Sequence, residues 1–417
     1  MIGQHKRGRL TDQSMAYILA GGRGARLFEL TSYCCKPCLP FGGRGRVIDF
    51  ALSNALHSGI SRIAIAAQYQ AQGLAEYLQQ GWMARYQRLG ASLDLHIAST
   101  QRKVYRGTAD AIYQNLSAIQ AYHPLYLIIL AADHIYKMDY QLMLEQHVET
   151  QADVTIACIT APATQAHHYG VIEVDEHDRI FKFVEKPDLL PAQSDDTAPY
   201  LVSMGIYIFN FDFLLAQLRH DAADLYSQHD FGQNIIPHAL QAGRVYAHRF
   251  ENSCVRNHKS IDPYWRDIGT LDSYWAANLD LIRTESALDL DNPDWPIWSS
   301  PYLVMGGEHQ HNRIVRSRSS LSSVTAPSLA MNKADLCHSL VFNTVRVMAS
   351  ARLEESVILP HVEIGQRARL KRVIVDSHVK IPHGLIVGED AELDSLHFRR
   401  LNSGLCLITQ AMIDRLH

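Results

Sequence analysis

Short apolar runs alternate with amphipathic stretches over about the first 290 residues of the chain. Apolar runs of strand length occupy residues 16–20, 62–67, 93–99, 126–131, 154–159 and 203–209. Helical patterns lie between them at residues 48–58, 72–81, 109–121 and 140–151. Each connection is long enough to join parallel strands by a right-handed crossover. The pattern predicts an α/β domain built on a mostly parallel central sheet.

A different rhythm, with a period of six residues, begins near residue 340. It repeats in three series: Val341, Val347, Leu353 and Leu359; Ile358, Ile364 and Leu370; and, after a phase slip, Val375, Ile381, Val387 and Leu393. A hexapeptide period is typical of a β-helix, and the alternative is chance alternation in a small β domain. The Pro-, Gly- and Ser-rich texture of residues 290–330 indicates a linker. We therefore expect two domains, at residues 12–290 and 291–417.

Composition and charge are those of an ordinary globular chain. Its 417 residues include 39 Lys and Arg against 43 Asp and Glu, which gives a net charge of −4 and argues against a nucleic-acid scaffold. The longest clean apolar run, residues 126–132, is far shorter than the roughly 18 residues that a membrane span needs. The apolar stretch at residues 15–20 is too short for a signal-peptide core. We therefore expect a cytoplasmic protein with no nucleic-acid or membrane partner.

The seven cysteines are too sparse for a secreted disulfide framework. Cys34, Cys35 and Cys38 lie together and the chain has 22 histidines, so a zinc site has to be considered. No second cysteine pair with ligand spacing follows this cluster. The sequence therefore favours buried or half-buried thiols.

A glycine-rich turn, Leu19-Ala-Gly-Gly-Arg-Gly-Ala-Arg26-Leu27, directly follows the first predicted strand. Gly21 and Gly22 allow backbone N–H groups to approach a phosphate, and the N-terminus of a following helix would add a favourable dipole. Arg23 and Arg26 supply positive charge for a polyphosphate. Such turns also occur for geometric reasons alone, and this one matches neither the P-loop nor the dinucleotide fingerprint. The turn therefore needs support from other motifs.

That support comes from a series of segments in order along the chain. They are Lys36-Pro37, Arg46-Val-Ile-Asp-Phe-Ala-Leu-Ser-Asn54, Tyr105-Arg-Gly-Thr-Ala-Asp-Ala111, Asp133-His-Ile-Tyr-Lys137, Phe183-Val-Glu-Lys-Pro187, Ser203-Met-Gly-Ile-Tyr207, His229-Asp-Phe-Gly232 and Tyr264-Trp-Arg-Asp267. With the glycine turn, they resemble the signature of the sugar-nucleotide pyrophosphorylases and, within that group, of the bacterial glucose-1-phosphate adenylyltransferases. The resemblance implies a nucleotide-binding α/β domain followed by a left-handed parallel β-helix.

The resemblance also implies a reaction, in which ATP and α-D-glucose 1-phosphate give ADP-glucose and pyrophosphate for glycogen synthesis. Because one polyanion must attack another, cations and positioning have to carry the catalysis, and no protein nucleophile is needed. Asp133 and Asp267 carry over as ligands of Mg²⁺, which prefers carboxylate oxygens. Without the motifs, either aspartate alone would be read as a helix cap or a loop carboxylate. The family relation further implies a homotetramer.

The other site residues carry over one by one from the resemblance. Arg23 and Lys36 are the implied triphosphate contacts and, with Asp133, the implied catalytic residues. Gly21, Gly22 and Arg26 complete the implied ATP site, and Gln68 matches the position expected to read adenine. The implied glucose 1-phosphate site comprises Tyr105, Gly170, Glu185, Lys186 and Ser203, with Lys186 on a strand and contacting the phosphate.

Three departures from the family pattern lie near this implied site. Ala25 replaces a Thr or Ser, Ala132 replaces the Gly before the catalytic aspartate, and Gln233 replaces a Lys. They leave open a catalytically silent subunit that modulates an active partner. A pyrophosphorylase that uses another nucleotide is the nearer alternative.

Three further departures concern regulation. Tyr33, Cys34 and Pro40 stand where enteric members carry a Lys, an Arg and a His that serve a sugar-bisphosphate activator and AMP. A charge-assisted hydrogen bond contributes about 1.5 to 3 kcal/mol, so losing two cations should weaken such sites substantially. The sequence predicts an active enzyme with altered or blunted allosteric responses.

Overall fold

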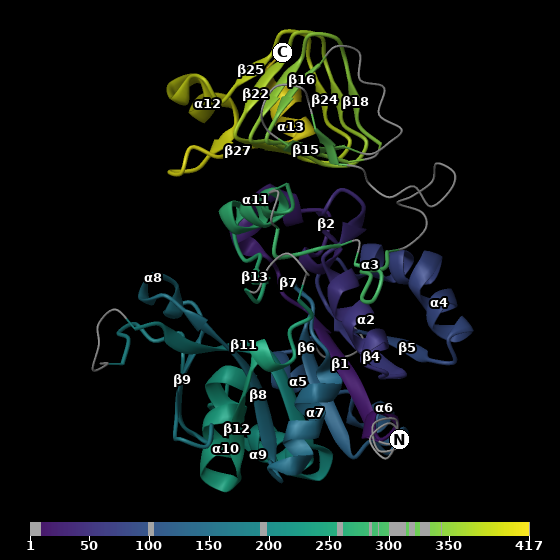
Figure 1. The fold of residues 1–417 in the computed structure, drawn as a ribbon, viewed down its shortest axis with the longest axis vertical. Coiled ribbons are helices and arrows are strands. Elements are labelled where there is room, and N and C mark those ends of the chain that lie inside the picture. Colours follow the sequence, from purple (N-terminus) through teal and green to yellow (C-terminus); the bar gives the residue numbers. More distant parts are fainter. Residues whose placement is uncertain are drawn as a thin grey trace.

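The computed structural model describes residues 10–98, 104–191, 198–256, 262–282, 286–290, 292–299, 314–316, 322–325, 334–342 and 344–416. They form an α/β part and a β-helix, and helix α11 (Leu271–Asp280) lies where the two meet (Figure 1). Most of the predicted linker at residues 290–330 lies outside the described residues.

The α/β part is built on one sheet with the strand order β10-β9-β11-β6-β1-β4-β5, to which β8 and β12 add beside β11. Its parallel half comprises β1 (Ser14–Ala20), β4 (Arg62–Ala67), β5 (Ser92–Ile97) and β6 (Tyr126–Ala131). These four strands lie within two residues of their predicted bounds. Most aliphatic side chains of β1, β4 and β6 are buried, as expected for strands covered on both faces, whereas Ile97 at the end of the edge strand β5 is 38% exposed.

The other half of the sheet is mixed, and two of its strands, β10 and β11, run antiparallel to this core. β11 (Tyr200–Asn210), predicted at residues 203–209, is antiparallel to β6 and to β8 (Val154–Ala161). β9 (Gly170–Val174) and β10 (Ile180–Glu185) form a hairpin, and β12 (Val245–Arg249) adds parallel to β8. β10 and β11 both pair antiparallel with β9, so β11 keeps the direction that the hairpin gives to β10.

The predicted helices are present, and two of them are interrupted. The helices of the α/β part are α2 (Ile48–His57), α3 (Ala71–Tyr77), α4 (Met83–Arg88), α5 (Thr108–Tyr113), α6 (Leu116–Gln120), α7 (Tyr140–Glu149), α8 (Ala163–Ala166), α9 (Phe211–Ala223) and α10 (Ile236–Ala242). The helix predicted at residues 72–81 continues from α3 through a π-helical turn, η3 (Leu78–Trp82), into α4. The helix predicted at residues 109–121 breaks into α5 and α6 at Asn115, whose Nδ2 donates to the Ala111 carbonyl at 2.8 Å and to the Tyr105 hydroxyl at 3.0 Å.

Three parallel sheets form the sides of the β-helix. Their strands are β15 (Ser322–Thr325), β17 (Leu340–Val341), β20 (Val357–Ile358), β23 (Val373–Val375) and β27 (Cys406–Ile408); β16 (Asp335–Cys337), β19 (Arg352–Glu354), β22 (Arg369–Lys371) and β25 (Ile386–Val387); and β18 (Arg346–Val347), β21 (Glu363–Ile364) and β24 (Lys380–Ile381). β14 (Ile314–Arg316), β26 (Arg399–Arg400), α12 (Ala391–His397) and α13 (Gln410–Ile413) flank them.

The coil length differs from the predicted multiple of six. Val341 pairs with Ile358, and Ile358 pairs with Val375, so these two coils span 17 residues each and the phase slips by one residue in each of them. Ile358 rather than Leu359 therefore continues the stacked series. Leu393 was expected on a face, but it is 50% exposed on α12, because the side chain of Asp390 caps a helix there and ends the coil.

A continuous apolar core joins the two parts, since residues of α11 and of the β-helix belong to one buried cluster. Trp275 Nε1 donates to the Glu355 carbonyl at 2.7 Å, and the Arg372 guanidinium lies 4.5 Å from the centroid of the Trp275 ring. Arg399 forms a bidentate ion pair with Glu29. The β-helix is thus held by packing and polar contacts as well as by the chain.

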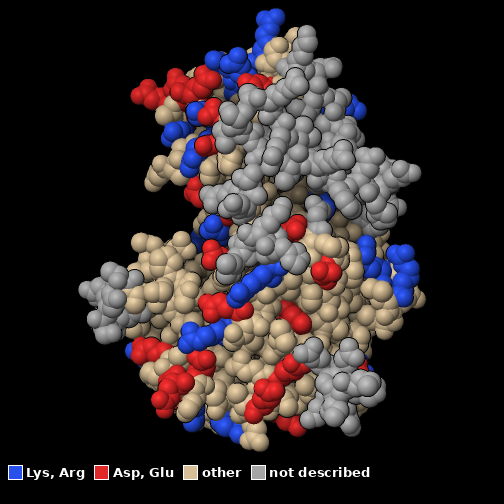
Figure 2. Space-filling view, viewed as in Figure 1, with Lys and Arg blue, Asp and Glu red and all other residues tan. Residues whose placement is uncertain are grey.

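Charges of both signs are interspersed on the face shown in Figure 2 rather than gathered by sign. The longest helix in the described ranges, α9, has 13 residues, and none of the described helices has the length and hydrophobicity to cross a bilayer.

Candidate functional site

Two aspartates from distant parts of the chain meet beyond the carboxyl end of β6. Asp133 follows β6 and Ala132, and directly precedes β7 (His134–Tyr136). β13 (Trp265–Asp267) pairs antiparallel with β7, so that Asp267 lies opposite His134. This two-stranded ribbon brings the two carboxylates together at the edge of the sheet where ligands bind in open α/β folds.

Lys36 lies between these carboxylates, at the start of the 3-10 helix η2 (Lys36–Cys38). Its Nζ donates to Asp133 Oδ2 at 2.7 Å and to Asp267 Oδ1 at 3.1 Å, and its side chain is only 9% exposed. Burial acts to lower the pKa of the Lys36 amine, but the two carboxylates outweigh it and hold this pKa above its usual value. Burial likewise acts to raise the pKa of Asp133, yet Lys36 and His134 hold it well below its usual range. The cluster is therefore a lysine ammonium clamped by two carboxylates.

The same carboxylates fit a divalent cation. Asp133, His134 and Asp267 each offer one ligand atom, and these atoms lie within 4.8 Å of one another, the one such group in the described part of the chain. His134 Nδ1 is buried without a hydrogen-bond partner. Mg²⁺ commonly binds through one or two carboxylates together with substrate phosphates and water. The two aspartates already hold one cationic group, the ammonium of Lys36, so their oxygens suit this chemistry.

The cysteine cluster offers no comparable set of three metal ligands in the described part of the chain. Cys34, Cys35 and Cys38 are free thiols, and no metal-ligand group that includes them occurs among the described residues. Cys35 and Cys38 are buried and Cys34 is half-buried, as the sequence favours.

A cavity of about 520 Å³, here called the main cavity, opens beside Asp133. Its volume is within the usual range for small-molecule sites. Gln68 Oε1 accepts a hydrogen bond from the Tyr105 backbone N–H at 2.7 Å, which ties the loop before α5 to the end of β4. The structure brings seven of the predicted site residues into the lining: Gly21, Gly22, Gln68, Tyr105, Asp133, Glu185 and Lys186.

Arg23 and Arg26 do not line the main cavity. Arg23 is exposed, and its guanidinium lies 4.8 Å from the ring centroid of Tyr69, which does line the cavity. Arg26 lines a second cavity of about 300 Å³ together with Asp267. Since Lys36 contacts Asp133 and Asp267, it links the linings of the two cavities.

The segment after the glycine turn is not the regular helix expected from the sequence. It is a 3-10 segment, η1 (Ala25–Thr31), which is interrupted at Phe28 with φ 51°. A short, kinked segment aligns few peptide dipoles, so it contributes little of the expected N-terminal field. Gly21 and Gly22 of the turn line the main cavity, so their backbone lies beside the space that a phosphate would fill.

Of the residues predicted to bind glucose 1-phosphate, some line the main cavity and others lie behind its wall. Glu185 ends β10, and Lys186 follows that strand instead of lying within it, with φ 43°. Lys186 Nζ pairs with Glu185 Oε1 at 2.7 Å while its side chain is 61% exposed. Gly170 and Ser203 do not line the cavity. They lie behind it: a Cβ on Gly170 would be 2.9 Å from Glu185 Oε2, and Ser203 Oγ accepts from the N–H of Gly205, a lining residue, at 3.1 Å.

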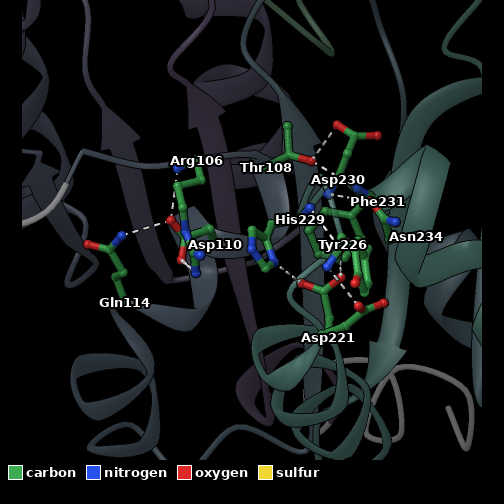
Figure 3. Close-up of polar contacts among 12 residues, drawn as sticks. Arg106, Thr108, Asp110, Gln114, Asp221, Tyr226, His229, Asp230, Phe231 and Asn234 are labelled. Atoms are coloured by element: carbon green, nitrogen blue, oxygen red, sulfur yellow. Dashed lines mark hydrogen bonds and ion pairs between the residues drawn. The ribbon is translucent and has the colours of Figure 1, made fainter.

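Two loops of the cavity wall are locked to each other (Figure 3). Thr108 Oγ1 donates to Asp230 Oδ2 at 3.0 Å and accepts from the Phe231 backbone N–H at 2.9 Å. The Ala109 backbone N–H donates to the His229 carbonyl at 2.8 Å. These bonds join the loop that contains Tyr105 to the loop at residues 228–232.

A buried carboxylate fixes the second loop. His229 Nδ1 lies 2.8 Å from Asp221 Oδ2, and the two side chains are 5% and 7% exposed (Figure 3). Ser227 Oγ donates to Asp221 and accepts from the His229 backbone N–H at 2.9 Å. His229 has φ 54°, a backbone conformation that residues other than glycine seldom adopt. The cluster therefore holds a strained backbone in place.

Sequence reasoning missed several lining residues: Tyr69, Gly205, Tyr207, Asp230 and Phe231. All but Tyr69 lie inside motifs that the sequence displays, so the signal was present. The motifs did not say which of their side chains face a cavity. Tyr207 and Phe231 stack with ring centroids 5.7 Å apart, and they give the cavity an apolar surface.

Comparison with known proteins matches both parts of the chain. A nucleotidyl transferase family model matches residues 15–284, and a GlmU-like C-terminal hexapeptide model matches residues 308–408, which confirms the predicted left-handed β-helix. Proteins called glucose-1-phosphate adenylyltransferase are similar over nearly their whole length. The one from Rhodopseudomonas palustris (strain TIE-1) is 48% identical over 97% of each chain. Those from Agrobacterium fabrum (strain C58) and Rhizobium etli (strain CIAT 652) are each 49% identical over 98% of each chain.

Proposed function

The chain belongs to the glucose-1-phosphate adenylyltransferase family of nucleotidyl transferases, and on that premise we propose that its main cavity converts ATP and α-D-glucose 1-phosphate into ADP-glucose and pyrophosphate. The observation that carries the proposal is the buried Lys36 ammonium, held between Asp133 and Asp267 beside this cavity. ADP-glucose then serves glycogen, or α-glucan, synthesis. Nothing in the comparisons favours a catalytically silent subunit.

The transfer of AMP between two polyanions requires positive charge held at fixed positions. An oxygen of the glucose 1-phosphate attacks the α-phosphorus of ATP, a new P–O bond forms, and the bond to pyrophosphate breaks. Lys36 stabilises the charge that develops there, and its two carboxylates hold it in place before the substrates arrive. Arg23 and Arg26 contact the triphosphate, and the backbone of Gly21 and Gly22 approaches its phosphates.

The rest of the lining recognises the sugar phosphate and the base. Lys186 binds the phosphate of glucose 1-phosphate, and Glu185 accepts from sugar hydroxyls. Tyr105 borders the same space, and the Gln68 side chain reads adenine. Gly170 and Ser203 act from behind the lining, through their contacts with Glu185 and Gly205.

We include Mg²⁺ in the proposal, with Asp133 and Asp267 as the groups that would hold it. When bound, the ion neutralises phosphate charge and helps to orient the nucleotide. Calorimetric titration of MgCl₂ into the protein tests this independently of turnover. Heat of binding should be present in the wild type and absent in Asp267→Asn, and equal binding by both would exclude this ligand set.

The assembly, the location and the domain roles are further parts of the proposal. We propose a cytoplasmic homotetramer in which residues 12–290 carry the catalytic site and residues 291–417 comprise the linker and the β-helix. Weakened responses to a sugar bisphosphate and to AMP stay a prediction from Tyr33, Cys34 and Pro40.

The experiment is a panel of nucleoside triphosphates with glucose 1-phosphate, in which the sugar nucleotide formed is identified by mass spectrometry. ATP should be preferred, and a preference for UTP or dTTP would overturn the assignment of the base. Lys186→Ala should raise the KM for glucose 1-phosphate. Lys182→Ala is the matched control, because Lys182 lies on β10 just before Lys186, is half exposed and pairs with Glu173 away from the cavity.

A further inference from the structure

The proposed reaction does not use the thiols that surround Lys36. Cys35 caps η2 and Cys38 ends it, so the two cysteines enclose Lys36 and Pro37 in a Cys-X-X-Cys segment. Their exposed fractions are 3% and 1%, and both are free thiols. Such a segment in an α/β protein is a recurrent redox motif.

The backbone already holds these two cysteines at the separation that a disulfide needs. The Cys38 N–H donates to the Cys35 carbonyl at 2.9 Å. A turn closed by this bond keeps its terminal Cα atoms within about 7 Å, and a disulfide spans about 4.4 to 6.8 Å between Cα atoms. A bond between the two sulfurs therefore needs side-chain rotation and only a small backbone shift.

The surroundings favour a thiolate at Cys35. The neighbouring Cys38 lowers the pKa of the Cys35 thiol although burial acts to raise it, and the positive charge of Arg46 favours the lower pKa. The neighbouring thiols of Cys34 and Cys35, together with burial, raise the pKa of the Cys38 thiol. Arg46 Nε is buried without a hydrogen-bond partner, so a cationic group with spare donor capacity lies near the sulfurs. A lowered pKa beside a cation is typical of a reactive cysteine.

We propose that Cys35 and Cys38 are a site of reversible oxidation by a peroxide, and that the disulfide they form moves Lys36 away from Asp133 and Asp267 and lowers activity. The Cys35 thiolate attacks one oxygen of hydrogen peroxide and the O–O bond breaks, which leaves a sulfenic acid and hydroxide. The hydroxide takes up a proton and becomes water. The Cys38 sulfur then attacks the Cys35 sulfur, the S–O bond breaks, and the Cys38 proton leaves with the oxygen as a second water. The two thiols lose two electrons, which the peroxide gains, and a dithiol returns them.

Lys36 is the link between this bond and catalysis. The closed ring contains the backbone of Lys36, while its Nζ depends on contacts of 2.7 and 3.1 Å with two carboxylates. Bringing the sulfurs to about 2 Å shifts the backbone of η2 slightly, and the proposal is that this shift moves the Lys36 ammonium. Displacement of a positioning group by about 1 Å can cost about a hundredfold in rate. The effect on activity rests on the proposed function, whereas formation of the disulfide does not.

The test uses the full-length protein, first reduced and then treated with hydrogen peroxide. Free thiols are alkylated before trypsin digestion, and the peptide of residues 27–44 carries all three cysteines of the cluster. We expect this peptide to lose two hydrogens, with Cys34 alkylated and Cys35 and Cys38 protected until reduction. Pyrophosphate release should fall by on the order of tenfold or more and recover with dithiothreitol.

Variants separate the pairing from general oxidation. Cys35→Ser and Cys38→Ser should keep the basal activity and lose the response to peroxide, and either one suffices if the other does not fold. Cys34→Ser is the matched control and should respond like the wild type. A disulfide that includes Cys34, no disulfide at all, or a Cys35–Cys38 disulfide without loss of activity would each overturn the proposal. A reduced protein that forms the disulfide but never releases pyrophosphate supports the thiol site and refutes the proposed function.

Discussion

Replacing Gly107 by alanine tests the two locked loops that form one wall of the main cavity. The added Cβ would lie 2.3 Å from the His229 carbonyl oxygen and 2.4 Å from that of Gln228, whereas ordinary contact begins at 3.4 Å. Both neighbours are backbone atoms, so no side-chain rotation relieves the overlap. Gly107 has φ −167°, an extended conformation open to any residue, so the clash alone opposes alanine. The loops must separate by about 1 Å to accept the methyl group, because packed interiors have no spare space.

That separation should reach the proposed glucose 1-phosphate site, since Tyr105 and Gly232 lie on the two loops and line the cavity. Misplacement by about 1 Å can cost about a hundredfold in rate, and overpacking typically costs about 1–3 kcal/mol of stability. We expect Gly107→Ala to lower kcat/KM for glucose 1-phosphate by about ten- to a hundredfold while the protein stays folded at 25 °C. The assay is pyrophosphate release at saturating ATP, with thermal unfolding followed by circular dichroism.

Gly73→Ala is the matched control for this prediction. Gly73 lies in α3, and a Cβ there would meet no atom within 4 Å. Its kinetics should equal those of the wild type. If Gly107→Ala folds and keeps its kcat/KM for glucose 1-phosphate within about twofold of the wild type, then this wall does not position the sugar phosphate.

Two further predictions concern buried polar groups. Asp221→Asn weakens the hold on His229 and should raise the KM for glucose 1-phosphate several-fold with little change in kcat; the same shift in the exposed neighbour variant Asp224→Asn would refute this role. Burial lowers the pKa values of His147 and His248 to about 4, so between about pH 4 and 6.5 the unfolded state binds more protons than the folded state. The free energy of unfolding should therefore fall as the pH drops through this window, by up to about 1.4 kcal/mol per pH unit for each histidine. When this free energy is measured by urea unfolding at several pH values, it should depend less steeply on pH in His147→Gln than in the wild type. An unchanged pH dependence would contradict the assignment.

Much of the fold could be predicted because a strand that is buried on both faces of the sheet appears in the sequence as a continuous apolar run. Strands β4 and β6 coincide with the predicted apolar runs at residues 62–67 and 126–131. The antiparallel direction of β11 has no local signal, because it depends on the hairpin that precedes it. The coil length of 17 residues could not be predicted from the local pattern either. A slip of one residue per coil keeps every aliphatic position apolar, so that Ile358 and Leu359 look equally suited to the series.

The candidate site was predictable as a set of motifs rather than as an arrangement. Lys36 is separated from Asp133 by 97 residues and from Asp267 by 231, and no spacing rule reveals contacts over such distances. The two aspartates are brought together by the pairing of β13 with β7, a long-range contact that forms only in the folded protein. Charge was a poor guide to position, because Arg23 and Arg26 lie outside the main cavity despite their place in the glycine turn.

The central claim is that Lys36 and its two aspartates catalyse adenylyl transfer to glucose 1-phosphate. Its most direct test is pyrophosphate release from ATP and α-D-glucose 1-phosphate by the wild type and by Asp133→Asn, which keeps the size of the side chain and removes its charge. The account predicts equal amounts of ADP-glucose and pyrophosphate from the wild type, and a rate lower by about two to three orders of magnitude in the folded variant. A wild type that forms no ADP-glucose, or an Asp133→Asn variant that works at the full rate, would contradict it.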